Sequence, residues 1–122
     1  MSANSRNCLM VEDATIIAKA LTRIAAWLDL SNQDLRAIIG VVDGNTVIAS
    51  LASNEAASTN ALLLIQLHVL LTGIVGGDAG AAGSWLKSYN VALEARPLEL
   101  MQQRTGLKRV ADYLESRGSV SL

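Results

Sequence analysis

The longest apolar stretch of the chain, from Asn54 to about Thr72, constrains the fold more than any other. It has helical spacing, and its polar side consists of four residues near one line: Glu55, Thr59, Gln66 and Gly73. A helix that is hydrophobic almost all round must be buried on most sides. Because a chain of 122 residues can hardly cover it alone, we predict a homodimer whose interface includes Leu63, Leu67, Leu70 and Leu71.

A membrane location is not expected for this helix. Its most apolar part, from Ala61 to Val75, is shorter than the roughly 20 residues that a spanning helix needs, and it contains Gln66 and His68. The single cysteine, Cys8, cannot form an intrachain disulfide, and the N-terminus lacks the pattern of a signal peptide. These features indicate a reducing, cytoplasmic setting without a membrane partner.

The remaining composition predicts an all-α fold. Sustained period-two alternation is absent from the sequence, which has one Pro and no Phe, while 51% of the residues are hydrophobic. The core must therefore be aliphatic and rich in alanine. The net charge of −1 gives no general reason to expect strong attraction to nucleic acid or to anionic membranes.

The N-terminal half reads as a helix-turn-helix-like unit after a loose segment at residues 1–10. A first helix is predicted from Glu12 to Leu30, with Asp13 as a possible cap. A capping box at residues 31–34 starts a short helix that Gly40 closes. After a turn at residues 43–44, Asn45 is expected to cap a second short helix. Residues 45–53 then occupy the recognition position of a helix-turn-helix.

DNA binding by this unit is expected to be weak. The sequence has no Lys or Arg between Arg36 and Lys87, and non-specific affinity comes mainly from cations that neutralise phosphates. Asn45, Thr46 and Ser50 remain candidates for contacts with phosphates or base edges. A helix-turn-helix kept for packing and one that contacts operator DNA are equally compatible with this pattern.

The C-terminal third combines helical periodicity with closely spaced start and stop signals. Asp78 is expected to cap a helix that ends after Trp85 and Leu86, and Arg96-Pro97 opens a short helix, because proline suits a first helical position. We predict Thr105 as the N-cap of the last helix. The expected C-cap of that helix is Gly118, preceded by Arg117 at the negative end of the helix dipole.

This ordered set of residues resembles the toxin-binding domain of the Xre/MbcA/ParS antitoxin family. The matching residues are Trp85-Leu86, Asn90, Leu93, Arg96-Pro97-Leu98-Glu99-Leu100, Thr105-Gly106, Val110, Leu114 and Gly118. The sequence departs from the family pattern at two places. Tyr89 stands where the family often has Pro, and Glu94-Ala95 stands where small, glycine-like residues are common.

The resemblance implies a three-helix toxin-binding domain at residues 76–122, after a helical and dimerising region at residues 11–75. It also implies a partner toxin of the RES fold, which consumes NAD or transfers its ADP-ribose group. In such pairs the C-terminal end of the antitoxin covers the active site of the toxin. A basic cleft for the NAD pyrophosphate would suit a terminal carboxylate at Leu122. The candidate toxin-binding residues are Arg104, Lys108, Arg109, Tyr113, Arg117, Gly118, Ser119, Val120, Ser121 and Leu122.

Catalysis by the chain itself is not expected. His68, the only histidine, lies in an apolar helix and is expected to be a hydrogen-bonded core or interface residue. Cys8 lacks an activating neighbour, and the sequence shows no cluster of metal ligands and no nucleotide-binding glycine motif, so no cofactor is predicted. Two alternatives to an antitoxin remain: a transcriptional repressor of its own operon and a purely structural dimerisation module.

Overall fold

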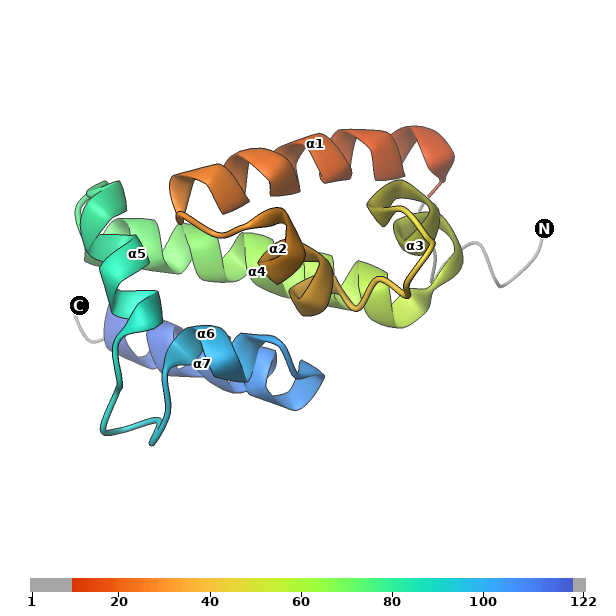
Figure 1. Cartoon of the computed structure of the whole chain (residues 1–122). Helices are drawn as coiled ribbons and strands as arrows, with labels where there is room; N and C mark the ends of the chain where they lie inside the picture. The colour runs from red at the N-terminus through yellow and green to blue at the C-terminus, as the bar shows by residue number, and fades with distance from the viewer. Residues whose placement is uncertain (1–9, 120–122) are drawn as a thin grey trace.

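The chain is described by a computed structural model that covers residues 10–119, apart from the side chains at positions 104, 118 and 119. Within that range it contains helices only, with one isolated bridge between Asn90 and Ala95, and the all-α prediction is confirmed. The helices, shown in Figure 1, are α1 (Val11–Trp27), α2 (Asn32–Ile39), α3 (Val47–Ser53), α4 (Glu55–Ile74), α5 (Ala79–Lys87), α6 (Pro97–Met101) and α7 (Arg104–Ser119).

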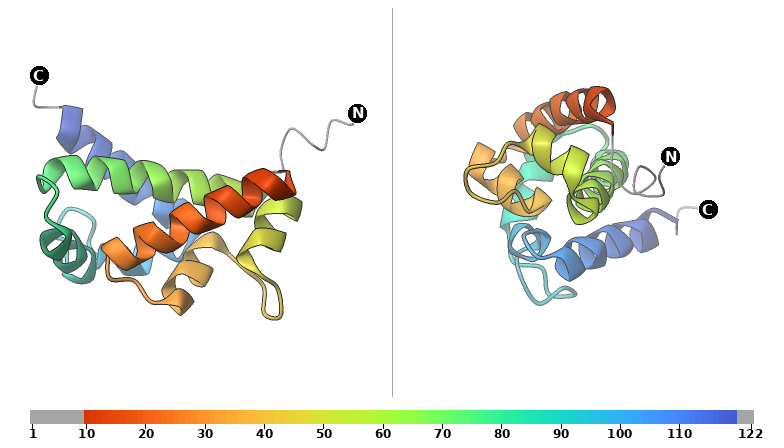
Figure 2. Two further views of the ribbon diagram at one scale, coloured as in Figure 1. Left: turned by 90° about the horizontal axis from the view of Figure 1, so that it is seen from above. Right: turned by 90° about the vertical axis from the view of Figure 1, so that its right-hand side faces the viewer.

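The long helix α4 runs through the middle of the fold. Figures 1 and 2 show α1 on one side of it and α7 on the opposite side, while α2, α3 and α5 also pack against it. Leu64, Leu67 and Leu71 are consequently buried within the chain itself. The chain therefore covers much more of α4 than the sequence led us to expect. Leu67 and Leu71 are withdrawn from the predicted dimer interface, because their side chains belong to the core.

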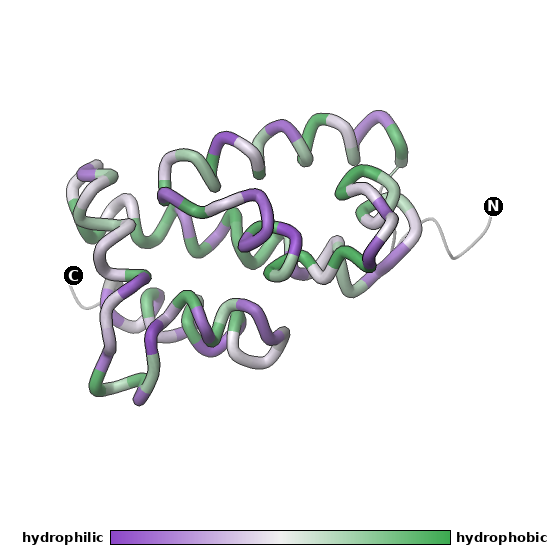
Figure 3. Tube along the Cα trace, in the orientation of Figure 1, coloured by the Kyte–Doolittle hydropathy of each residue, from purple (hydrophilic) through white to green (hydrophobic). Residues whose placement is uncertain are grey.

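The face of α4 that stays exposed is the thin polar line read from the sequence. Thr59, Gln66 and Gly73 lie on it, but so do two large apolar side chains, Leu62 and Val69, which are 56% and 63% exposed. Figure 3 shows apolar residues along most of α4 with polar residues among them, and a mixture of polar and apolar residues along α1. By length and composition alone, α4 could span a bilayer. The core helix of a soluble protein meets the same two criteria.

Several helix ends form where the sequence predicts them. Ser31 and Asp34 make a reciprocal capping box at α2, in which the Ser31 hydroxyl accepts from the Asp34 amide at 2.9 Å. Gly40 ends that helix with a φ of 86°, in the left-handed region that favours glycine. Asn54 caps α4 and Asp78 caps α5 through their side-chain oxygens. These ends depend on residues a few positions apart, so the local sequence predicts them.

Three predicted N-caps are wrong. Helix α1 follows Met10, which has no side-chain capping bond, and Asp13 lies in the first turn. At α3 the cap is Thr46, whose hydroxyl accepts from the Ala49 amide at 3.0 Å, rather than its neighbour Asn45. Helix α7 begins at Arg104, so Thr105 lies inside it. Each predicted cap lies within three residues of the observed start of its helix, and only at α3 do two adjacent polar residues compete for the role.

Buried polar groups join the short helices to α4. The Asn60 side-chain amide donates to the backbone oxygen of Ile39 at 3.1 Å, at the end of α2. The Ser58 hydroxyl donates to the backbone oxygen of Leu51, in α3, at 2.9 Å. Both α2 and α3 also pack on α1. Each short helix is thus held by the long helices, so α3 is anchored by more than the turn that connects it to α2.

Candidate functional site

The exposed side of α7 carries a line of basic and aromatic residues spaced four apart: Arg109, Tyr113 and Arg117. Residues at this spacing are neighbours on one helical face. The Arg117 guanidinium lies over the Tyr113 ring, 5.7 Å from its centroid. This cation–π contact holds the guanidinium against the Tyr113 ring, one turn back along α7. The sequence predicted all three as toxin contacts, and the structure brings them onto one line, which we call the α7 line.

Helix α5 extends the α7 line with a residue that the sequence reading did not include in the site. The Trp85 ring stacks on Tyr113, with ring centroids 6.2 Å apart and an interplanar angle of 12°. Both side chains are half-buried. Trp85 was noted only as part of the family pattern, and nothing in the sequence pairs it with a residue 28 positions later. The stack joins the end of α5 to the second half of α7.

The other predicted cation of α7 for which the structure describes a side chain is already paired. Lys108 forms an ion pair with Asp112, at 3.1 Å between Nζ and Oδ1, one turn along the same helix. An exposed pair of this kind contributes little to stability. Because Asp112 offsets the charge of Lys108, Arg109 and Arg117 are the remaining cations of α7 whose side chains the structure describes.

A loop at residues 88–96 connects α5 to the short helix α6. The backbone groups of Asn90 and Ala95 bond across its neck, and Leu93 points into the core with 3% exposure. Glu94 has a φ of 59°, in the left-handed region. This conformation explains why a small, glycine-like residue would suit that position, at which the sequence departs from the family pattern.

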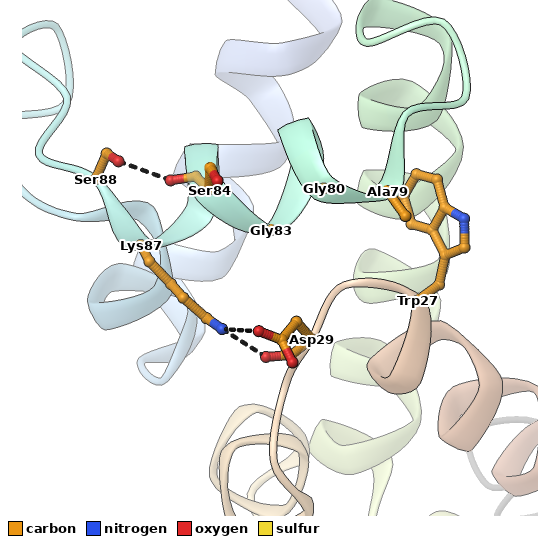
Figure 4. A pocket seen from close by; sticks show the side chains of 8 residues that line it. All are labelled: Trp27, Asp29, Ala79, Gly80, Gly83, Ser84, Lys87 and Ser88. Atoms are coloured by element: carbon orange, nitrogen blue, oxygen red, sulfur yellow. Dashed lines mark hydrogen bonds and ion pairs between the residues drawn. The ribbon is translucent and has the colours of Figure 1, made fainter.

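A cleft of about 590 Å³ lies between the end of α1 and α5, and the sequence did not predict it. Figure 4 shows its lining: Trp27, Asp29, Ala79, Gly80, Gly83, Ser84, Lys87 and Ser88. Small residues on α5 leave the space, and Lys87 closes one end by pairing with Asp29 at 2.7 Å. The hydrogen bond from Lys87, followed by its charge, lowers the pKa of the Asp29 carboxyl.

His68 packs on the far side of Trp27. The imidazole meets the indole edge-on, with ring centroids 5.1 Å apart and an angle of 87°. Burial lowers the pKa of His68 from its ordinary value of 6.5, because the imidazolium loses hydration there. His68 was expected to be a hydrogen-bonded core or interface residue; in the structure it is half-buried, and the contact described for its ring is the aromatic one with Trp27. The neighbouring Thr72 hydroxyl donates to the backbone oxygen of His68 at 2.6 Å.

The predicted DNA contacts are not brought together as a side-chain cluster. Ser50 is 4% exposed in the core, so it is withdrawn from the predicted DNA contacts. Thr46 is exposed, but its hydroxyl is used as the cap of α3. Asn45 is exposed in the turn before it. A DNA contact through Asn45 and Thr46 stays a prediction.

The C-terminal end of the site differs from the sequence-based expectation. The last helix continues through Gly118 to Ser119, so Gly118 is not its C-cap. Val120, Ser121 and Leu122 lie outside the described residues, as do Cys8 and the side chain of Arg104. Of the predicted dimer residues, Leu63 and Leu70 are half-buried on α4.

Comparison with known families identifies the region that contains these features. Residues 70–118 match the family model described as the antitoxin Xre/MbcA/ParS C-terminal toxin-binding domain. The match begins in the last turns of α4 and includes α5, the 88–96 loop, α6 and nearly all of α7. No curated protein matches the chain. The resemblance seen in the sequence is thereby confirmed for this part of the chain.

Proposed function

Residues 70–118 form a toxin-binding domain of the Xre/MbcA/ParS antitoxin family, and on this premise we propose that the chain neutralises a toxin of the RES fold. Such a toxin consumes NAD or transfers its ADP-ribose group. In our proposal the domain docks beside the toxin's active site, and the residues that follow α7 enter the cleft. The tail and the substrate then exclude each other, so the antitoxin needs no catalytic group of its own.

The observation that carries this proposal is the α7 line together with Trp85. Arginine and aromatic side chains are enriched at the energetic centres of protein interfaces. Here Trp85, Tyr113 and Arg117 are already stacked on one another in the unbound chain. Because these side chains are already ordered by their contacts, they lose little conformational entropy when a partner docks on them. The line also leads directly to Ser119 and the segment that follows it.

The partner for the test is the product of the reading frame next to the one for this chain. We expect it to arrest growth when expressed alone and to consume NAD, or to transfer ADP-ribose, when purified. Adding this chain should stop that reaction. A neighbouring product that leaves NAD intact would contradict the RES assignment, even if it binds the chain.

The occluding tail is tested by separating binding from inhibition. Deleting residues 119–122 should preserve co-purification with the toxin, because the packed helices remain, while NAD consumption returns. The matched comparison is Val110→Asp, which places a charge at a fully buried position of α7 and should abolish binding and inhibition together. If the shortened chain still silences the toxin completely, the tail does not occlude the active site.

A further inference from the structure

We propose that the 88–96 loop is a preformed docking element that places Tyr89 and Val91 in an apolar depression on the toxin. The proposal rests on the proposed function, because it concerns the same partner. It adds a contact that is separate from the tail and from the α7 line. Figure 1 shows the loop projecting beyond the helices, between α5 and α6.

The first argument is the exposure of the two side chains. Val91 is 82% exposed, more than any other large apolar residue that the structure describes, and Tyr89 is 64% exposed. Connecting loops usually present polar residues to water. A valine and a tyrosine, one residue apart on a projecting loop, leave apolar surface hydrated, and burying it in a complex would be favourable.

The second argument is that the loop is held in one shape. The Asn90 amide donates to the Ala95 oxygen at 3.0 Å, and the Asn90 oxygen accepts from the Glu94 amide at 2.7 Å. The Asn90 side chain accepts from the Leu93 amide at 3.0 Å. Asn90 thus bonds across the neck of the loop through its backbone and within the loop through its side chain. Preorganisation of this kind lowers the entropy lost on binding.

The third argument is that the loop keeps this shape through a side chain buried in the core and through an unfavourable backbone conformation. Leu93 inserts into the core, which anchors the turn just behind Val91. Glu94, the next residue, is held at a φ of 59°. A non-glycine residue is unfavourable in this left-handed region. Such conformations persist where surrounding contacts impose them, and they gather at ligand clamps and binding sites.

The occupant inferred is the toxin rather than a second copy of the chain. The loop lies wholly inside the part of the chain that matches a toxin-binding domain. Trp85, three residues before the loop, stacks on Tyr113 and so joins the loop to the α7 line. The charged residues at its two ends, Lys87 and Arg96, are already paired within the chain, with Asp29 at 2.7 Å and with Glu99 at 3.7 Å. The matching toxin surface is therefore defined by its apolar depression.

Affinity for the toxin tests the contact. Val91→Asp should weaken binding of the purified chain to the neighbouring gene product by about tenfold or more, as for loss of an apolar interface anchor. The control is Val42→Asp, because Val42 is likewise 66% exposed in a loop but lies outside the matched domain. Thermal unfolding should be unchanged in both variants. Equal toxin affinities for the two variants would overturn the proposal.

A photo-crosslinking amino acid identifies what covers the loop. Placed at position 91 in the chain bound to the same gene product, it should crosslink to that protein, whereas at position 42 it should not. Crosslinking to a second copy, or none at all, contradicts the loop contact. The proposed function is tested separately. If the position-91 crosslink forms but NAD consumption continues, the loop binds the toxin while the chain does not inhibit it, and the proposed function is wrong.

Discussion

The backbone of Leu100, in α6, lies directly against Gly106, in α7. A Cβ atom added to Gly106 would overlap the carbonyl oxygen of Leu100 and crowd its carbonyl carbon and Cα. The two helices can therefore approach each other only where α7 has no side chain. This contact gives a physical reason for the glycine after Thr105 in the family pattern, since it sets how α6 lies on α7.

Gly106→Ala is predicted to lower the free energy of unfolding by about 1–3 kcal/mol, the usual cost of forcing extra volume into a packed contact. The measurement is urea denaturation followed by circular dichroism. Gly73→Ala is the matched control, because Gly73 lies in α4 with nothing within 4 Å of an added Cβ. That change should instead stabilise the chain by about 0.5–1 kcal/mol. Equal effects at the two sites would mean that α6 can move away from α7.

Asn60→Ala is predicted to destabilise the fold by about 1–3 kcal/mol, because the Ile39 oxygen at the end of α2 loses its side-chain donor inside the core. Gln66→Ala, at an exposed position of the same helix, should change stability by less than about 0.5 kcal/mol. Hydrogen exchange of the α2 amides should speed up only in the Asn60 variant. A neutral Asn60→Ala would mean that the lost bond is offset, by water at the Ile39 oxygen or by removal of the Asn60 Oδ1 atom, which is buried without a described hydrogen-bond partner.

His68 should make stability depend on pH. Its pKa is lowered in the folded chain, so the unfolded chain binds the proton more readily. Well above pH 6.5, the ordinary pKa of histidine, His68 has no effect on the free energy of unfolding. That free energy falls as the pH drops through 6.5 toward the pKa of His68 in the folded chain. His68→Gln removes this dependence. Between pH 8 and pH 5.5, the melting temperature of the parent chain should drop further than that of the variant; parallel drops would contradict the assignment.

The homodimer prediction now concerns the exposed face of α4. Leu62 and Val69 lie two turns apart on that face, so Leu62→Glu combined with Val69→Glu should separate the dimer without unfolding the chain. Light scattering at micromolar concentration should report a dimer for the parent chain and a monomer for the double variant. Val42→Glu, exposed in a loop, should leave the dimer intact. A monomeric parent chain would refute the prediction.

The amino-acid sequence alone was enough to predict the helices and many of their ends. Ser31 with Asp34, Asn54, Asp78 and Pro97 act within a few residues of the backbone groups that they serve, so local chemistry is sufficient. The ordered pattern from Trp85 to Gly118 was also enough to indicate the toxin-binding family. Where prediction failed locally, as at Asn45 and Thr46, two adjacent residues were both suitable caps, and the structure uses Thr46.

Which side of each helix is covered depends on how the helices pack together in three dimensions. The periodicity of α4 shows that it is apolar nearly all round, but it cannot tell that Leu67 and Leu71 are buried while Leu62 stays exposed. Contacts between distant residues were equally out of reach. The Trp85–Tyr113 stack and the Asp29–Lys87 ion pair, whose partners are 58 residues apart, arise from how whole helices are placed. Such contacts depend on the summed packing of many side chains, for which no single stretch of sequence carries a signal.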